Sequence, residues 1–176
     1  MSGPDAEGPT ERLLLRRLEQ GDLDTVARWN ANELHTRHLA GVLTRAQTEK
    51  AFERWQRHWE EHGFGMLAIL DKESGALIGR TGPQYHRAWP HDPEIGWGLD
   101  PAWWGRGLAT EAGAASVAWA FGELAFERVV SITTEANLAS RRVMEKLGFE
   151  LHEVVPFLEL DLDLWVHALD RKGLYP

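Results

Sequence analysis

The segment from Pro93 to Thr133 constrains the fold more than any other part of the sequence. It contains an alternating strand pattern at Pro93 to Leu99, a helix rich in alanine and glycine at Gly107 to Leu124, and an apolar strand at Arg128 to Thr133. The chain holds one such strand–helix–strand crossover, with antiparallel patterns around it. That order excludes both a repeated doubly wound sheet and a sandwich.

The flanking segments supply further strands and helices. Arg12 to Leu18 predicts a first strand, Phe64 to Leu70 and Ala76 to Thr81 predict a hairpin, and Phe149 to Val155 and Leu164 to Leu169 predict the last strands. The predicted helices are Leu23 to Asn30, a helix from the cap Thr44 to about Glu61, and Leu138 to Leu147. We expect Gly82 to Asp92, with its two prolines and two histidines, to be a looser segment. The result is a three-layer α+β fold, with a mixed, mostly antiparallel sheet of about seven strands and helices on both faces.

The length of 176 residues and the absence of an internal linker predict one domain, from residue 11 to 176. Residues 1–10, MSGPDAEGPT, are expected to form a disordered tail. They lack the basic start and apolar run of a secretory signal, and no apolar run approaches the ~20 residues of a membrane span. We therefore expect a cytoplasmic protein without a membrane partner.

Composition removes several classes of function. The chain has no cysteine, so thiolate metal sites and cysteine nucleophiles are excluded, and we expect no metal. A net charge of −8 argues against general nucleic-acid binding, which needs a basic face, and favours a cationic acceptor.

The most informative loop runs from Asp100 to Thr110, where a strand ends, a proline breaks it and a helix begins. The first turn of a helix leaves ~4 amide groups without internal partners and carries the positive end of the helix dipole, which together favour a phosphate. Gly105 and Gly107 would let the backbone approach an anion, and Arg106 adds positive charge between them. A tight connection without a ligand would explain the two glycines equally well.

Two known phosphate-binding patterns do not fit this loop. The P-loop pattern GxxxxGK followed by serine or threonine is absent. The dinucleotide fingerprint fails because Thr110 stands where its third glycine or alanine belongs, and no strand–helix repeat precedes it. The loop therefore points to another pyrophosphate ligand.

The segments WGRGLATEA, from Trp104 to Ala112, and NLASRRVMEKLGFE, from Asn137 to Glu150, lie about 30 residues apart. Together they resemble the GNAT superfamily of acetyl-coenzyme A-dependent N-acetyltransferases. WGRGLATEA resembles its pyrophosphate loop, in which glutamine or arginine is followed by two residues, glycine, one residue, and glycine or alanine. Trp104, Gly107 and Ala109 occupy those places. Tryptophan at the first place departs from the general pattern, but a tryptophan-glycine pair is similar to the branch that acetylates the N-termini of ribosomal proteins. NLASRRVMEKLGFE, from Asn137 to Glu150, resembles the superfamily's asparagine-led helix.

The resemblance implies a GNAT-type sheet that splays between its fourth and fifth strands, and acetyl-coenzyme A as the donor. It also implies that Asn137 contacts the pantetheine arm while capping its helix, and that Arg142 and Lys146, like Arg141, are available to phosphates. The expected cofactor-binding residues are Trp97, Leu99, Trp104, Gly105, Arg106, Gly107, Leu108, Ala109, Thr110, Asn137, Ser140 and Arg141.

Glu94 and Ser140 are the predicted catalytic residues. Strand alternation places Glu94 on one face with Gly96 and Gly98, so the glycines clear space beside a carboxylate that can accept a proton from an ammonium. An exposed edge carboxylate is the alternative, with Asp92, His91 and Glu135 as substitutes for the base. By resemblance, Met144 stands where most members have a tyrosine acid, and Ser140 becomes the donor to the leaving thiolate.

The resemblance also guides expectations for the surroundings of this site. Glu111 would repel a pyrophosphate and is expected to point away from it. By resemblance, Trp29, His35 and His38 fall in the region that covers the acceptor site, although Trp29 fits a core role better.

The identity of the acceptor stays open at this stage. A primary amine is expected, with a protein or peptide N-terminal α-amine preferred and a small-molecule amine such as an aminoglycoside or polyamine as the alternative. A different acyl group, a non-catalytic acyl-coenzyme A-binding module and a homodimer are further arrangements that the sequence leaves open.

Overall fold

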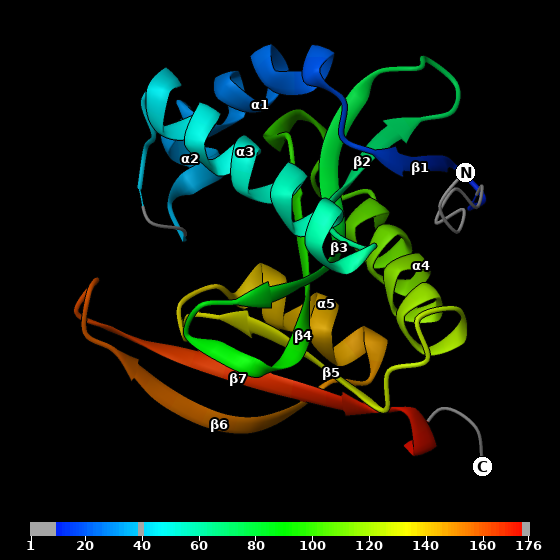
Figure 1. Cartoon of the computed structure of the whole chain (residues 1–176), viewed down its shortest axis with the longest axis vertical. Coiled ribbons are helices and arrows are strands. Elements are labelled where there is room, and N and C mark those ends of the chain that lie inside the picture. The colour runs from blue at the N-terminus through cyan, green and yellow to red at the C-terminus, as the bar shows by residue number, and fades with distance from the viewer. Residues whose placement is uncertain (1–9, 39–40, 174–176) are drawn as a thin grey trace.

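The computed structural model describes residues 10–38 and 41–173 (Figure 1). Its strands are β1 (Leu13–Arg17), β2 (Leu67–Asp71), β3 (Leu77–His86), β4 (Trp89–Leu99), β5 (Arg128–Thr133), β6 (Glu150–Phe157) and β7 (Leu162–Asp170). Its α-helices are α1 (Leu23–Asn30), α2 (Glu33–Thr36), α3 (Arg45–His62), α4 (Leu108–Gly122) and α5 (Leu138–Leu147). Three short 3₁₀ helices complete it: η1 (Gln20–Asp22), η2 (Pro101–Trp103) and η3 (Arg171–Gly173).

The seven strands form one mixed sheet in the order β1-β2-β3-β4-β5-β7-β6. Every neighbouring pair is antiparallel except β4 and β5, which α4 joins as a parallel crossover. β4 and β5 are in register at a single position, Glu94 opposite Val130. Beyond it, the Ser131 hydroxyl donates to the Ile95 carbonyl at 3.0 Å. The expected splay between the fourth and fifth strands is therefore present, and it opens toward the carboxyl ends of both.

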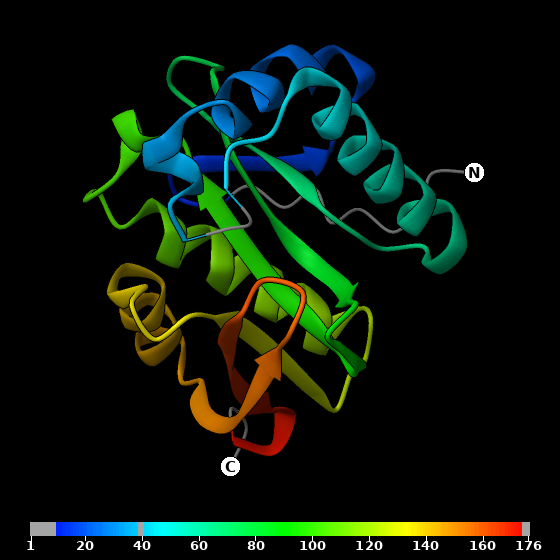
Figure 2. The ribbon, with the colours of Figure 1, turned by 90° about the vertical axis from the view of Figure 1, so that its left-hand side faces the viewer.

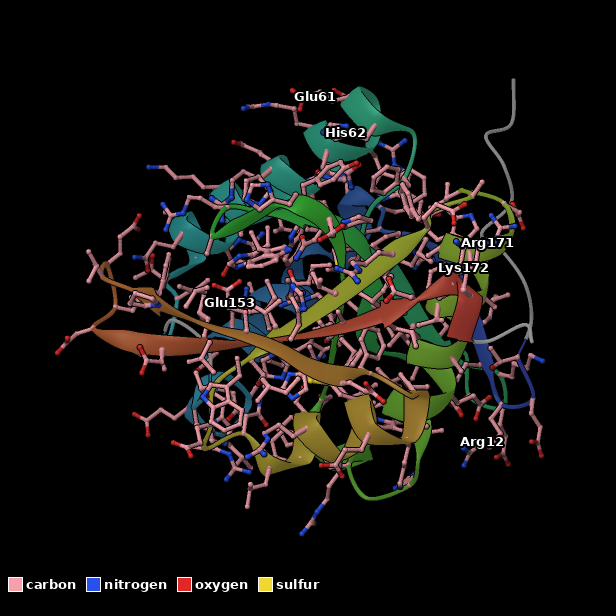
Figure 3. All side chains as sticks on the ribbon, turned by 90° about the horizontal axis from the view of Figure 1, so that it is seen from below. Arg12, Glu61, His62, Glu153, Arg171 and Lys172 are labelled. Carbon is pink, nitrogen blue, oxygen red and sulfur yellow. The ribbon has the colours of Figure 1, made fainter. Side chains whose placement is uncertain are left out.

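Helices cover both faces of the sheet (Figure 2). Adjacent residues of β2 show this: Ile69 packs in a core cluster with Leu108 and Trp119 of α4, whereas Ala68 packs in a cluster with Val26 of α1 and Phe52 of α3. Figure 3 shows α3 and α5 on opposite sides of β5 and β7. The predicted three-layer fold is confirmed, and the splay lies within its central layer, the sheet.

The segment from Gly82 to Asp92, expected to be loose, belongs instead to long strands. β3 continues to His86 and β4 begins at Trp89, so that the two form an extended hairpin. The two prolines of this segment are Pro83 on β3 and Pro90 on β4. Both are tolerated because, among the described strands, β3 beyond Thr81 and β4 before Glu94 pair only with each other, so each strand has one edge that needs no amide. The strand prediction here was wrong because proline was read as a breaker without knowledge of the free edge.

The expected tail, residues 1–10, lies outside the described residues except for Thr10. The Thr10 hydroxyl donates to Glu111 Oε1 at 2.6 Å, which attaches this residue to α4. Within the described ranges, no helix is both long and apolar enough to span a bilayer.

Candidate functional site

The loop after β4 is held in place by Asp100. Its Oδ1 accepts from the Ala102 amide at 2.9 Å and starts η2, while its Oδ2 accepts from Trp29 Nε1 at 3.1 Å. Trp29 is buried in the core between α1 and the sheet, which gives it the core role expected from the sequence. The loop is thus fixed to α1 before α4 begins.

The start of α4 offers free backbone amides. Gly105 and Gly107 have φ angles of 75° and 77°, in the left-handed region that favours glycine, and Gly107 is the residue that precedes the helix. The amide of Glu111 donates to the Gly107 carbonyl at 3.1 Å, so the amides of Leu108, Ala109 and Thr110 come before the first helical bond. This arrangement can bind a phosphate group.

A cavity of about 380 Å³, here called the loop cavity, lies between this helix start, the end of β4 and the first turns of α5. Ten of the predicted cofactor-binding residues line it: Trp97, Leu99, Trp104, Gly105, Gly107, Leu108, Ala109, Thr110, Asn137 and Ser140.

Two predicted cations do not line the loop cavity. Arg106 lies over the Trp103 ring, with its guanidinium 4.8 Å from the ring centroid. Arg141 lies over the Trp165 ring at 4.5 Å and donates to the Glu135 carbonyl at 3.2 Å. Arg142 and Lys146 face the cavity instead. Sequence order alone could not separate Arg141 from Arg142, because neighbouring residues of a helix point about 100° apart.

His35 contributes a buried polar atom that has no partner among the described residues. Its side chain is 8% exposed, and Nδ1 lies 3.1 Å from the Leu99 carbonyl, so Nδ1 carries the proton. Burial lowers the pKa of His35, which keeps the ring neutral. Nε2 is then a free acceptor that faces the loop cavity, where the amide groups of a pantetheine chain can donate to it. The residues present therefore fit coenzyme A.

Asn137 and Ser140 lie where α5 begins. Asn137 Oδ1 accepts from the Ser140 amide at 3.2 Å, which is the cap expected from the sequence. The Ser140 hydroxyl has no hydrogen-bond partner in the part of the chain that the structure describes, and it faces the cavities.

A second cavity, here called the sheet cavity, has a volume of about 830 Å³ and lies between α3, the β3–β4 hairpin, β5 and β7. It shares five lining residues with the loop cavity: His38, Arg80, Trp97, Asn137 and Ser140. The two cavities therefore meet at the splay between β4 and β5, and a donor in one can reach an acceptor in the other.

Glu94 lines the sheet cavity and is only 7% exposed. It is therefore a buried carboxylate, and not the exposed edge residue that the sequence left as the alternative. Burial raises the pKa of Glu94, and this outweighs the lowering by His86, by the hydrogen bond from Gln84 and by Arg80. A carboxylate with a raised pKa in a cavity is suited to accept a proton.

Arg80 is a site residue that sequence reasoning missed. It stands opposite Gly98 in the β3–β4 register and lines both cavities. Its guanidinium lies 4.6 Å from the Trp55 ring centroid, and burial lowers its pKa. The sequence could not identify Arg80 as a site residue, because the pairing of its strand with neighbouring strands decides which residues and cavities its side chain reaches.

Other candidate residues lie away from the cavities. Asp92, His91 and Glu135 line neither cavity. Met144 is 0% exposed and packs in the core between α4, α5 and the sheet, so this position does not present a proton donor.

Glu111 points away from the loop cavity, as expected. Its Oε2 pairs with the Arg12 guanidinium at 2.7 Å, and the carboxylate faces β1. Its negative charge is thus neutralised beside the free amides of the α4 start.

Known proteins resemble this chain in both sequence and fold. The family model described as an acetyltransferase (GNAT) domain matches residues 12–150. N-acetyltransferase YnaD of Bacillus subtilis (strain 168) is 27% identical over 139 residues, which are 79% of each chain. The structure of an acetyltransferase from Agrobacterium tumefaciens str. C58 is 29% identical, with a TM-score of 0.83 over 93% of this chain and 94% of that chain.

More distant structures share the fold with different acceptors. The ribosomal-protein-S5-alanine acetyltransferase from Vibrio fischeri has a TM-score of 0.72 at 18% identity, over 96% of this chain and 98% of its own. The spermidine N-acetyltransferase from Vibrio cholerae, in complex with CoA and spermine, has a TM-score of 0.74 at 18% identity, over 92% and 96%. The shared fold therefore does not specify an acceptor.

Proposed function

This chain belongs to the GNAT acetyltransferases, which are acetyl-CoA-dependent N-acetyltransferases, and from that premise we propose that it acetylates the N-terminal α-amine of a protein or peptide. One observation carries the proposal. The loop cavity and the sheet cavity meet at the splay between β4 and β5, with the buried carboxylate of Glu94 on the sheet-cavity side.

The loop cavity is the proposed site of acetyl-coenzyme A, which supplies an activated acetyl thioester when bound. The free amides of Leu108, Ala109 and Thr110 would hold the pyrophosphate, because they point out of the positive end of α4. His35 Nε2 would accept from a pantetheine amide, and Asn137 would donate from the nitrogen that its cap leaves free. Arg142 and Lys146 line the same cavity and would neutralise further phosphate charge.

Proton movement is assigned to Glu94 and Ser140. Glu94 accepts the proton of the acceptor ammonium, directly or through water, so that the free amine can attack. Ser140 lies at the junction of the cavities with an unpartnered hydroxyl, where it can donate toward the departing sulfur. Orientation of the two substrates across the splay supplies the remaining rate enhancement.

Two features support a peptide as the acceptor. The sheet cavity, at about 830 Å³, lies in the upper part of the ~300–1,000 Å³ range of pockets that bury a drug-sized ligand, so it can take more than one residue. Trp104-Gly105 and Ser140 also match the pattern of the ribosomal-protein branch. A small-molecule amine is the second candidate, because the fold also serves spermidine and aminoglycoside acetyltransferases.

A thiol-release screen tests the proposal. Acetyl-coenzyme A would be offered with short peptides that have different first residues, with spermidine, and with an aminoglycoside. Peptides with a blocked N-terminus are the matched control, because they keep every group except the reactive amine. We expect thiol release with at least one free N-terminus and none with its blocked counterpart. Release with the small amines alone would refute the peptide assignment.

A further inference from the structure

The sheet cavity is basic although the chain is acidic. Its charged lining residues are four arginines and two glutamates: Arg54, Arg57, Arg80, Arg87, Glu61 and Glu94. The whole chain has a formal net charge of −8. The overall charge had favoured a cationic acceptor, but the local charge of the cavity favours the opposite sign, and a ligand responds to the local field.

Three of these arginines form no salt bridge with a carboxylate of the described residues, although Arg80 interacts electrostatically with Glu94 at longer range. Arg87 is ion-paired with Glu159, whereas Arg54, Arg57 and Arg80 take part in none of the salt bridges of the described chain. Arg57 lies one helical turn from Glu61 and still does not pair with it. On the same helix, Arg45 pairs with Glu49 at 2.9 Å, so unpaired arginine is not a general property of α3.

Arg80 and Glu94 share one face of the β3–β4 hairpin. Arg80 is opposite Gly98 and Gln84 is opposite Glu94, and alternate residues of a strand face the same side. Gly96 and Gly98 follow Glu94 on this face of β4, where the Met66 methyl lies beside Gly96 and the His35 ring lies beside Gly98. A ligand in the sheet cavity therefore meets a buried carboxylate and a guanidinium on the same surface.

His58 does not add to the positive charge of the cavity. Its Nδ1 lies 2.8 Å from the Phe64 carbonyl, and its Nε2 accepts from the Tyr85 amide at 3.1 Å. Burial lowers the pKa of His58, so the ring stays neutral while both nitrogens are used. The arginines therefore provide the permanent positive charge of the sheet cavity.

We infer that the acceptor carries a carboxylate close to its reactive amine, as an N-terminus with an acidic residue at its first positions does. This inference rests on the proposed acceptor role of the sheet cavity. The ammonium is directed to Glu94, and the carboxylate to Arg80 or to the α3 pair Arg54 and Arg57. Arginine is suited to this role because its planar fork binds a carboxylate through two charge-assisted hydrogen bonds. A polyamine would place additional positive charge against the same arginines.

The test uses the full chain and two matched acceptor pairs. The peptide amides SEAA and SQAA differ only in whether the second residue is charged, and their amidated ends remove the other carboxylate. The small pair is 4-aminobutyrate and its amide, and spermidine is the cationic comparison. We expect kcat/KM for SEAA to exceed that for SQAA by about tenfold or more, since hydrogen bonds to charged groups are typically worth ~1.5–3 kcal/mol.

Variants identify the residues responsible. Arg80→Gln and the double variant Arg54→Gln/Arg57→Gln remove the charge at the two candidate positions, and Arg45→Gln is the matched control on α3 outside the cavity. Arg54 and Arg57 are exposed, so the double variant is expected to fold. We expect at least one of the first two to lose most of the preference for SEAA, and Arg45→Gln to retain that preference. The double variant should bind acetyl-coenzyme A like the parent in calorimetry, because Arg54 and Arg57 line the sheet cavity only, whereas Arg80 also lines the loop cavity.

The outcomes separate this inference from the proposed function. A preference for the acid in the small pair, without turnover of either peptide, would refute the peptide assignment and support the carboxylate inference. Peptide turnover with equal rates for SEAA and SQAA, or faster turnover of spermidine than of either peptide, would overturn the carboxylate inference. A preference that survives both arginine changes would overturn it as well.

Discussion

Gln84 Nε2 donates to Glu94 Oε2 at 3.1 Å, and the two residues stand opposite each other in the register of β3 and β4. This contact holds the carboxylate at a defined place in the sheet cavity, beside the splay. The hydrogen bond and the positive charge of Arg80 favour the ionised form, while burial disfavours it more strongly, so the pKa of Glu94 is raised. The pair therefore positions a base that releases and takes up its proton at higher pH than an ordinary glutamate.

Glu94→Gln is expected to lower kcat by ~10²–10⁴-fold, the usual contribution of a positioned acid–base group. The acetyl-coenzyme A affinity should stay near that of the parent, since Glu94 lines the sheet cavity only. The acidic limb of the pH profile of kcat/KM, which reports deprotonation of this carboxyl, should disappear. Steady-state kinetics across pH measure the rate and its pH profile, and calorimetry measures the affinity for acetyl-coenzyme A. An unchanged rate and profile would mean that water or another group takes the proton.

The same variant should alter the pH dependence of stability. Because the folded-state pKa of Glu94 is raised above 4.5, the folded state binds this proton more tightly than the unfolded state. The parent is then expected to lose stability as pH rises from the ordinary pKa toward the raised one, by at most about 1.4 kcal/mol per pH unit. Glu94→Gln removes this dependence. In denaturant unfolding, the free energy of unfolding of the variant should therefore increase relative to that of the parent as pH rises. Parallel curves would show that folding does not raise the pKa of Glu94.

The Asp100 to Thr110 loop, the strand–helix–strand crossover, and the segments of Glu94 and Asn137 were all predicted from the sequence, because each has a strong local signal. Glycine and asparagine at helix ends, and alternation along Pro93 to Leu99, depend on neighbours a few residues away. The face that holds Glu94, Gly96 and Gly98 follows from that alternation alone. The first two strands, the first half of β3 and the helices α1 and α3 were likewise recognised from their own periodicity, whereas the four-residue helix α2 was not predicted.

The rest of the site depends on pairing between segments. The β3–β4 register places Gln84 opposite Glu94, and Arg80 on the same face opposite Gly98. Gln84 also lay in a segment that its prolines made look irregular. The side on which Arg141 lies is likewise set by Trp165 on another strand. Such contacts leave no pattern within one segment, so the cluster of arginines that lines the sheet cavity could not be predicted from the sequence. The negative net charge of the chain suggested a cationic acceptor instead.

Gly107→Val is expected to abolish coenzyme A binding in calorimetry while the circular dichroism spectrum stays folded. Gly107 has a φ of 77°, which a β-branched residue adopts only with strain, and its amide belongs to the loop that faces the cavity. Gly63→Val is the matched control, because Gly63 has a φ of 74° at the end of α3 and lines neither cavity. If both variants bind coenzyme A like the parent, the cofactor lies elsewhere.

Asn137→Asp separates the cap of α5 from the contact with the cofactor. Aspartate keeps the oxygen that accepts from the Ser140 amide, so the helix should form, but it removes the nitrogen available to pantetheine. We expect KM for acetyl-coenzyme A to rise by about tenfold, since a lost hydrogen bond of ~1–1.5 kcal/mol corresponds to that order. Thermal unfolding close to that of the parent provides the control. A variant with the parent's KM would show that Asn137 is a cap only.

Ser140→Ala is expected to lower kcat less than Glu94→Gln does, because a thiolate can leave without a proton. The hydroxyl lies at the junction of the two cavities and has no partner in the described chain, so its removal should cost little stability. Ser140→Thr keeps a hydroxyl at the same position and should retain most of the rate, which a role in packing alone would not predict. If the alanine and threonine variants have the same rate, the serine does not donate the proton, and water in the cavities takes that role.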